Sequence, residues 1–348
     1  MDFQPNNLPD SPGHSDSFPS SSPRRRASLR DYLRIARPDH WIKNLFILPG
    51  VLAAVVLANE SWTWPSLLAK VMLALVATSL VASANYVINE WLDAKFDRFH
   101  PKKKNRPVVV AELRAFWVYV EYILLAIAGL TLSFFVNWPL APNPLFGAMG
   151  AWLFVMGILY NVEPFRTKDV PYLDVLSESV NNMIRLLMGW FTIAHSTIPP
   201  CSLILGYWMC GAFLMGMKRF AEYRMIGDPE RAGLYRKSFR RYSENMLAAS
   251  SVCYALAATF LLGIFLVKYR VELIFSIPFL IGLFGKYTAI AWHEDSSAQK
   301  PEKLFRERAL MLLSAAFFLS LIFGLVVDMP WLEIFTSDKL YPIHFSLH

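Results

Sequence analysis

The stretch PSLLAKVMLALVATSLVASANYVIN, residues 65–89, is an apolar run that can cross a hydrocarbon core of about 30 Å as an α-helix. It continues directly into EWLDAKFDRFHPKKKNRP, residues 90–107, where acidic side chains give way to a cluster of cations. Apolar runs of similar length recur along the chain. Of its residues 55% are hydrophobic and only 18% charged, whereas soluble domains carry about 25% charge. The sequence therefore predicts an all-α, polytopic membrane protein.

About nine transmembrane helices are expected around a central cavity that opens to the cytoplasmic side. Their approximate bounds are residues 42–60, 65–89, 114–136, 143–161, 172–195, 201–217, 246–267, 271–291 and 307–328. The connections after the second, fourth, sixth and eighth spans are longer and charged, while those after the first, third and fifth are short and nearly uncharged. Because basic loops stay in the cytoplasm, this alternation places the N-terminus there. We expect an integral protein of the bacterial inner membrane.

Three parts of the chain differ in composition. Residues 1–30 are rich in Ser and Pro and are expected to form a disordered cytosolic tail without a signal peptide. Residues 31–330 form the expected transmembrane domain, and residues 331–348 a short non-cytoplasmic tail. The three cysteines lack metal-binding spacing and are expected to be small core residues; they are Cys201, Cys210 and Cys253.

The end of the second span carries a polar stripe. Its members are spaced by four and share one helix face: Asn85, Asn89, Asp93 and Asp97. Carboxylates so placed repel each other unless a cation lies among them, and hard oxygen ligands suit Mg²⁺, which usually bridges to substrate phosphates. Beyond the stripe, four cations could hold the outer phosphate oxygens: Lys102, Lys103, Lys104 and Arg106. The alternative interpretation is an ordinary charged face beside the membrane, with the acids paired to neighbouring basic residues.

A second polar cluster lies in YNVEPFRTKDVPYLDVLSESVNNMIR, residues 160–185. Side chains on one helix face at steps of three or four are Asp174, Glu178, Asn181 or Asn182, and Arg185, with Arg166 and Lys168 in the preceding loop. Two such sites facing each other could hold a diphosphate between metal ions, which would neutralise the leaving group. A polar seam between helices is the alternative.

Two further segments offer cations. MKRFAEYR, residues 217–224, contributes Lys218 and Arg219 at the end of the sixth span. In RPDHWIKN, residues 37–44, Lys43 borders an apolar run and is a candidate for substrate contact. The bias of basic residues towards the cytoplasmic side would explain the sixth-span cations equally well.

These motifs resemble the UbiA superfamily of intramembrane transferases. The resemblance rests on the pattern N-x-x-x-D-x-x-x-D of Asn89, Asp93 and Asp97, the second acidic cluster and the nine-span plan, and it covers nearly all of residues 30–330. It implies Mg²⁺, an isoprenoid substrate and two acidic motifs over a central cavity. Glu90 departs from the family, which has Asp directly after Asn.

The second motif also departs from the family, because it lacks an Asp pair at a four-residue step. Asp169 and Asp174 are five apart, so Asp174 matches the family pattern more closely than Asp169.

Some features look closer to one branch, the decaprenyl-phosphate phosphoribosyltransferases. They are Arg37-Pro-x-x-Trp41-x-Lys43-Asn44, Asp97-x-x-His100-Pro-x-Lys103-x-x-Arg106-Pro107, Lys168 with Asp174, and Lys218-Arg219-x-Ala221-Glu222. This resemblance implies transfer of 5-phosphoribosyl from phosphoribosyl diphosphate to a polyprenyl phosphate, with release of diphosphate. The many cations favour this reaction, since it involves three phosphate-bearing groups. One alternative is a prenyltransferase that moves a polyprenyl group from its diphosphate to an aromatic or other acceptor, and another is a non-catalytic lipid-binding or transport protein.

The predicted site residues fall into three groups. The expected catalytic residues are Asp93, Asp97 and Asp174. The expected Mg²⁺ ligands are Asn89, Glu90, Asp93, Asp97, Asp174 and Glu178. The residues expected to bind phosphate groups are Lys43, Lys103, Arg106, Arg166, Lys168, Arg185, Lys218 and Arg219. The expected partners are an isoprenoid lipid phosphate or diphosphate, a diphosphate-bearing co-substrate and the membrane, but no nucleic acid. A homo-oligomer is left open, because nothing in the sequence specifies an interface.

Overall fold

A computed structural model describes residues 25–137, 142–293, 304 and 306–336. The first half contains β1 (Arg25–Arg26), α1 (Leu29–Ile35), the 3₁₀ segment η1 (Pro38–Ile47), α2 (Leu48–Leu57), α3 (Trp64–Asp97), η2 (Lys103–Asn105), α4 (Pro107–Val110), β2 (Ala111–Glu112), α5 (Ala115–Phe134), α6 (Pro144–Asn161) and η3 (Thr167–Asp169). The second half contains α7 (Leu173–Phe191), α8 (Cys201–Ile226), α9 (Pro229–Tyr235), η4 (Lys237–Arg240), α10 (Glu244–Tyr269), η5 (Val271–Ser276), α11 (Ile277–Trp292), α13 (Arg308–Val326) and η7 (Pro330–Phe335).

The all-α membrane class is confirmed. Within the described residues, eight helical segments are long and apolar enough to cross a membrane. Helix α7 adds a further long helix at the predicted fifth span, and its polar stripe explains why composition does not mark it as a span. The predicted first span, residues 42–60, is not one continuous α-helix. It begins with η1, and α2 starts only at Leu48, with Pro49 in its first turn, where a missing N–H is tolerated.

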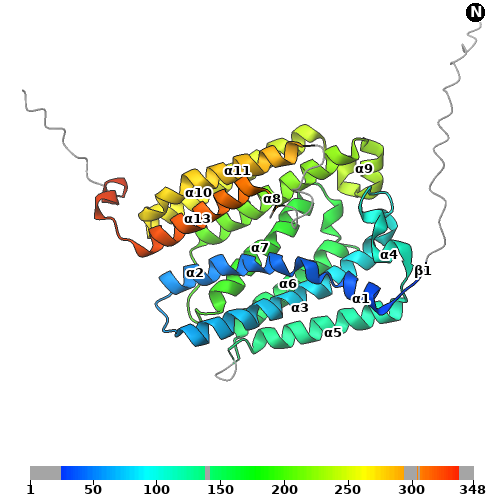
Figure 1. The fold of residues 1–348 in the computed structure, drawn as a ribbon, viewed down its shortest axis with the longest axis horizontal. Coiled ribbons are helices and arrows are strands. Elements are labelled where there is room, and N and C mark those ends of the chain that lie inside the picture. The colour runs from blue at the N-terminus through cyan, green and yellow to red at the C-terminus, as the bar shows by residue number, and fades with distance from the viewer. Residues whose placement is uncertain (1–24, 138–141, 294–303, 305, 337–348) are drawn as a thin grey trace, which may run out of the picture.

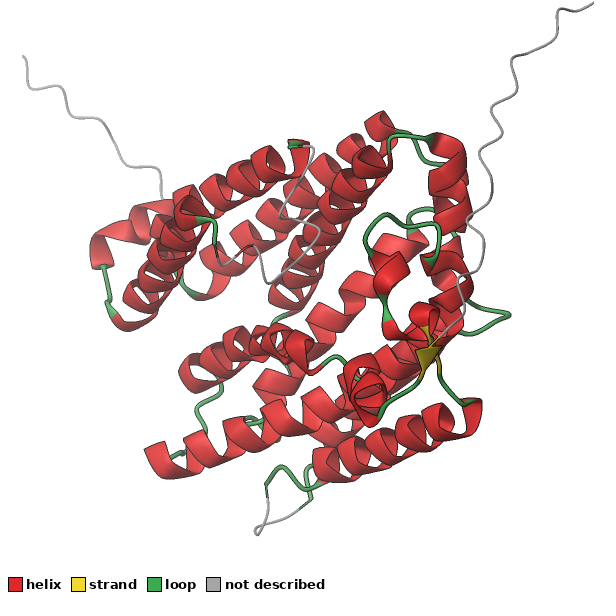
Figure 2. Ribbon diagram, turned by 45° about the vertical axis from the view of Figure 1, so that its right-hand side comes forward, coloured by secondary structure: helices red, strands yellow, loops and turns green. Residues whose placement is uncertain are grey.

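The helices form two groups with α7 between them, as Figure 1 shows. Helices α2, α3, α5 and α6 lie on one side, and α8, α10, α11 and α13 on the other. One apolar core joins α7 to the first group and contains Ile184 and Met188, while a second core joins α8, α10 and α11 around Phe213 and Phe220. Figure 2 shows the same almost wholly helical architecture, with one small two-stranded sheet. Helix α7 is thus enclosed, and its polar side chains face other helices rather than lipid.

Helices α2 and α7 cross at two glycines. A Cβ atom on Gly50 would stand 1.9 Å from the carbonyl oxygen of Leu186, and one on Gly189 would stand 2.0 Å from that of Ile47. Small residues at such crossings let helix backbones approach closely in membranes. This approach brings η1 and the middle of α7 together.

The ends of the predicted domains need correction. Residues 25–30 were predicted to belong to the disordered tail, yet β1 pairs in parallel with β2, and Ser28 caps helix α1. The remainder of that tail, residues 1–24, lies outside the described residues, as do residues 337–348 of the predicted C-terminal tail.

The cysteine prediction was wrong at two of three positions. Cys201 and Cys253 are exposed, and Cys210 is half-buried. The outer surface of a membrane bundle faces lipid tails that are as apolar as the core, so a small apolar side chain has little preference for the inside.

Candidate active site

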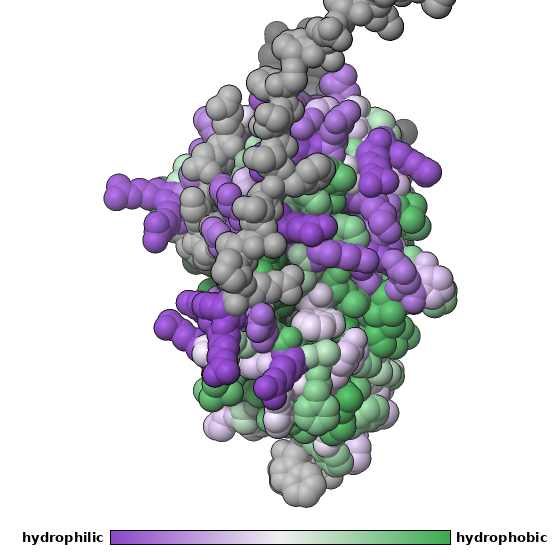
Figure 3. All heavy atoms as spheres, turned by 90° about the vertical axis from the view of Figure 1, so that its right-hand side faces the viewer, coloured by the Kyte–Doolittle hydropathy of each residue, from purple (hydrophilic) through white to green (hydrophobic). Residues whose placement is uncertain are grey.

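Polar side chains gather at one end of the bundle. Figure 3 looks at this end, where hydrophilic residues are concentrated beside α4 and α9. Three connections meet here: residues 98–114 between α3 and α5, residues 162–172 between α6 and α7, and residues 227–243 between α8 and α10. We call this the charged end. The two acidic motifs predicted to face each other lie on α3 and α7, and both reach the charged end.

Asp93 lies in the last turns of α3 and is paired with two cations. Its Oδ1 accepts hydrogen bonds from Arg166 Nη2 at 2.9 Å and from Lys168 Nζ at 2.5 Å. Asn89, one turn earlier, donates to Asp93 Oδ2 at 3.2 Å and to Asn161 at the end of α6. The stripe predicted from the four-residue spacing therefore exists, with the two predicted loop cations directly on it.

The loop before α7 has an unusual backbone. Arg166 has φ = 25° and Tyr172 has φ = 66°, which are conformations that L residues seldom adopt. The conformation of Arg166 lets its guanidinium reach Asp93 and Asp169. The conformation of Tyr172 precedes the first turn of α7, where Asp174 is buried. Strained backbone of this kind often marks functional sites.

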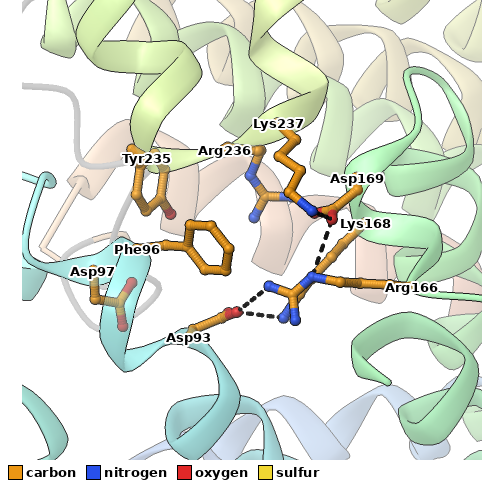
Figure 4. Close-up of a pocket in the computed structure, with 9 residues that line it drawn as sticks. All are labelled: Asp93, Phe96, Asp97, Arg166, Lys168, Asp169, Tyr235, Arg236 and Lys237. Carbon is orange, nitrogen blue, oxygen red and sulfur yellow. Dashed lines mark hydrogen bonds and ion pairs between the residues drawn. The ribbon is translucent and has the colours of Figure 1, made fainter. Parts of the chain in front are cut away.

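A small pocket, with a cavity volume of about 20 Å³, opens beside Asp93. Figure 4 shows its lining: Asp93, Phe96, Asp97, Arg166, Lys168, Asp169, Tyr235, Arg236 and Lys237. We call it the outer pocket. Burial lowers the pKa of Lys168 to about 8, while the neighbouring Asp93 acts in the opposite direction. Cations predicted from the α6–α7 loop thus share one pocket with the predicted acids.

The segment Tyr235–Lys237 was missed by the sequence analysis. Its residues come from the turn between α9 and η4, and Lys237 pairs with Asp169 at 3.0 Å. The sequence of this loop gave no distinguishing signal, because its basic residues fit the general charge bias of cytoplasmic loops. Only the fold shows that they line the outer pocket.

The other two acids of the first motif are buried with arginines. Asp97 accepts from Arg106 Nη1 at 2.7 Å, and Glu90 lies 3.3 Å from Arg106 Nε and 3.7 Å from Arg37 Nε. Glu90 and Asp97 are each at least 97% buried. Arg106 therefore joins two acidic residues that lie about two helical turns apart on α3. Glu90 does not line the outer pocket.

Asp174 is completely buried. Its oxygens accept from Tyr242 at 2.8 Å and Ser238 at 3.1 Å, and Arg219 and Arg236 approach to 3.5 and 3.7 Å. It does not line the outer pocket but reaches it through Arg236, whose side chain does. The structure thus sets Asp174 behind the pocket wall rather than opposite Asp93.

Glu178 lies one turn further along α7. It accepts from Tyr160 at 2.9 Å, pairs with Lys218 at 3.3 Å and contacts Arg219. Arg219 is 1% exposed, and it also approaches Glu222. It thus contacts three acids, since it also approaches Asp174 and Glu178. The predicted residues Lys218 and Arg219 are thus brought to the second acidic motif. They lie on helix α8, which extends beyond the predicted end at residue 217.

Glu222 fixes the loop that follows α3. It pairs with Lys103 at 2.7 Å, lies 3.3 Å from His100 Nε2 and accepts from Tyr235 at 3.0 Å. His100 Nδ1 accepts two backbone N–H bonds, so Nε2 carries the proton that it shares with Glu222. Burial lowers the pKa of His100, which keeps its ring neutral near pH 7. Lys103, a predicted phosphate-binding residue, is thereby held against α8 and α9.

Lys43 and Arg185 lie apart from the outer pocket. Arg185 Nε donates to Asn44 Oδ1 at 2.9 Å, which joins the middle of α7 to η1. Lys43 stands over the ring of Tyr86, 5.9 Å from its centroid. The predicted phosphate-binding residues therefore occupy more than one region.

The predicted six-residue metal set is not gathered around one point. Within the described residues, no group of three or more His, Cys, Asp and Glu side chains could hold a metal ion. Mg²⁺ usually binds one or two carboxylates together with substrate phosphates rather than a cage made only of protein ligands. Asp93 and Asp97, which both line the outer pocket, fit this mode.

A profile of the UbiA prenyltransferase family matches residues 47–322. The chain belongs to this family. It is accordingly a membrane transferase, and the resemblance seen in its motifs is confirmed.

Named relatives include decaprenyl-phosphate phosphoribosyltransferases and 4-hydroxybenzoate octaprenyltransferases. A decaprenyl-phosphate phosphoribosyltransferase of Mycolicibacterium smegmatis is 30% identical over 256 residues, 70% of this chain and 74% of that protein. One of Mycobacterium tuberculosis is 28% identical over 82% of this chain and 90% of its own length. A 4-hydroxybenzoate octaprenyltransferase of Paraburkholderia phytofirmans is 36% identical, but over only 33% of this chain and 37% of that protein.

The fold is also that of solved family members. A UbiA homologue of Archaeoglobus fulgidus, bound to GPP and Mg²⁺, matches with a TM-score of 0.62 and 19% identity, over 84% of this chain and 98% of its own. At this identity the match supports the fold alone.

Proposed function

We propose that this protein transfers 5-phosphoribosyl from phosphoribosyl diphosphate to a polyprenyl phosphate and releases diphosphate. The observation that carries the proposal is the number of cations around the outer pocket. Arg166, Lys168, Arg236 and Lys237 line it, against the carboxylates of Asp93, Asp97 and Asp169, and Arg106 already neutralises Asp97. A donor with both a diphosphate and a sugar phosphate requires such an excess of positive charge.

The long matches to two decaprenyl-phosphate phosphoribosyltransferases support the same reaction. The match to a 4-hydroxybenzoate octaprenyltransferase covers only a third of the chain and favours the alternative, transfer of a polyprenyl group from its diphosphate to an aromatic acceptor. Both reactions release diphosphate, so the acidic motif serves either. The difference lies in which substrate carries the diphosphate and in how many phosphate groups need cations.

In the proposed reaction the bond from ribosyl C1 to the diphosphate oxygen breaks, and its electron pair leaves with the diphosphate. An oxygen of the lipid phosphate forms the new bond to C1, so a phosphodiester results. Asp93 and Asp97 would hold Mg²⁺, which neutralises charge on the departing diphosphate. Arg166 and Lys168, which pair with Asp93 in this structure, would contact the phosphate oxygens of the donor. Catalysis then consists of positioning and of stabilising the departing charge.

The orientation of the protein follows from the same proposal. The charged end faces the cytosol, where phosphoribosyl diphosphate is dissolved, and the lipid approaches through the helices. We propose the bacterial inner membrane as the location.

The test is diphosphate release by the purified protein with Mg²⁺ in detergent, together with the mass of the lipid product. One reaction contains phosphoribosyl diphosphate and undecaprenyl phosphate, and the other contains a polyprenyl diphosphate and 4-hydroxybenzoate. Product in the first reaction alone supports the proposal. Product in the second alone refutes it and identifies an aromatic prenyltransferase. A non-catalytic lipid-binding or transport protein would give product in neither.

A further inference from the structure

Two cations, the buried Arg185 and the half-buried Lys43, lie in the helix bundle apart from the outer pocket. No ion pair joins Lys43 or Arg185 to a carboxylate among the residues that the structure describes, whereas Asp93, Asp97, Asp174, Glu178 and Glu222 each pair with at least one cation at the charged end. Burying an unpaired charge is costly, and in membrane proteins such charges mark binding sites or transport paths. Lys43 and Arg185 are therefore candidates for binding an anion.

Arg185 is held in a fixed orientation. Its side chain is 94% buried, Nε donates to Asn44 Oδ1 at 2.9 Å, and Nη1 donates to the carbonyl of Asn181 at 3.0 Å. Asn44 is itself fixed, because its amide donates to Ser79 at 2.8 Å. This leaves Nη2 without an acceptor in the described part of the chain. The guanidinium is thus preorganised by neutral groups, and its charge remains available.

Positive charge dominates the surroundings of Lys43. Its charged neighbours include Lys218, Arg37, Glu178 and Arg185. Glu178 is already shared by Lys218 and Arg219. The ring of Tyr86 lies beneath both Lys43 and Arg37, at 5.9 and 5.7 Å from its centroid. Aromatic faces attract cations but leave their charge uncompensated.

The depth of Arg185 distinguishes this region from the outer pocket. Glu178 and Arg185 are seven residues apart on α7, so they share a helix face and lie about 10 Å apart along the axis. Arg185 is twelve residues from the start of α7, which corresponds to about 18 Å from the charged end. A ligand here lies well within the bilayer.

We infer that Lys43 and Arg185 form an intramembrane site that holds the phosphate of the isoprenoid lipid before this phosphate moves to the donor in the outer pocket. The inference rests on the proposed function, since it assigns one substrate to each region. A lipid phosphomonoester carries about two negative charges at neutral pH, which matches two unpaired cations. Its apolar chain can remain between the helices while its head reaches Arg185.

The experiment uses the full chain in lipid nanodiscs. Lys43→Gln and Arg185→Gln remove one charge each, Arg185→Lys keeps the charge, and Lys70→Gln removes a lysine from the opposite end of α3 as a matched control. KM is measured for undecaprenyl phosphate and for phosphoribosyl diphosphate, with melting temperatures as a check on folding. We expect the two glutamine variants to raise the KM of the lipid at least about tenfold, and that of the donor less than about twofold. Arg185→Lys should retain part of the affinity, and Lys70→Gln all of it.

Direct binding separates this inference from the proposed function. Undecaprenyl phosphate is compared with the uncharged undecaprenol as a ligand that raises the melting temperature, with no turnover required. If wild-type protein prefers the phosphate and Arg185→Gln abolishes that preference, the subsite stands even if no phosphoribosyl lipid is formed. The inference is overturned if wild-type does not distinguish phosphate from alcohol, if the glutamine variants keep the preference, or if 4-hydroxybenzoate alone gives the Arg185-dependent shift. A rise in the KM of the donor instead of the lipid would also overturn it.

Discussion

Removal of the Arg219 charge should destabilise the protein, because this buried guanidinium serves three acids. It approaches Asp174 to 3.5 Å and Glu222 to 3.4 Å, and it contacts Glu178. Removing one partner of a buried ion pair costs about 3–5 kcal/mol, because the other charge is left uncompensated. Here each acid keeps a second cation, at 3.7, 2.7 and 3.3 Å for Asp174, Glu222 and Glu178. We therefore expect Arg219→Gln to cost about 3 kcal/mol, the lower end of that range.

The cost converts into a measurable change in melting temperature. A chain of 348 residues at about 2.1 cal/mol/K each has an unfolding entropy of about 0.7 kcal/mol/K, so the loss corresponds to about 4 °C. Thermal unfolding in detergent can be followed by the fluorescence of the 11 tryptophans. The control is Arg231→Gln on α9, which is exposed and should change stability by less than about 0.5 kcal/mol.

A double variant tests the electrostatic cause. Glu178→Gln combined with Arg219→Gln removes both partners of one pair, so it should melt above the single Arg219→Gln variant. The reasoning is refuted if Arg219→Gln melts within about 1 °C of wild-type, since about 4 °C is expected. It is also refuted if the two substitutions lower the melting temperature additively, because coupled partners should not act independently.

Three further predictions address the metal, the helix crossing and the outer pocket. Asp93→Asn should lower turnover by at least about 100-fold, since changes to residues around metal ligands already cost about 10–100-fold. EDTA should abolish wild-type turnover until Mg²⁺ is restored. Normal turnover of the variant would contradict the role of Asp93 in metal binding. Gly50→Ala should fail to fold, because its Cβ would meet a carbonyl oxygen at 1.9 Å. The control Gly263→Ala, whose Cβ would have nothing within 4 Å, should melt at or slightly above the wild-type temperature. Equal melting temperatures of both variants would contradict the close crossing of α2 and α7. Lys237→Gln should raise the KM of phosphoribosyl diphosphate by about tenfold without changing the KM of the lipid. Arg241→Gln, at an exposed position, should change neither KM. An equal rise in the KM of phosphoribosyl diphosphate for both variants would point to a general charge effect.

The positions of most helices, and the residues that share one helix face, could be predicted from the sequence. Spans are set by the length of apolar runs, and the stripe of Asn89, Asp93 and Asp97 follows from a spacing of four, which places residues on one helix face wherever the helix lies. The family could be inferred for the same reason, since its motifs are local patterns. The continuation of α8 beyond residue 217 could not, because charged residues at a span end are equally compatible with a loop.

The pairing of charged side chains depends on the tertiary structure and could not be predicted from the sequence. Glu90 is paired with Arg37 and Arg106, and Asp174 is enclosed by side chains that lie more than 40 residues away in the chain. The outer pocket likewise takes Arg236 from a loop whose basic residues resemble any other cytoplasmic loop. Such contacts depend on how closely the helices pack and where each loop crosses the charged end. Coulomb attraction makes many pairings favourable, and packing allows only those whose geometry also buries the neighbouring side chains.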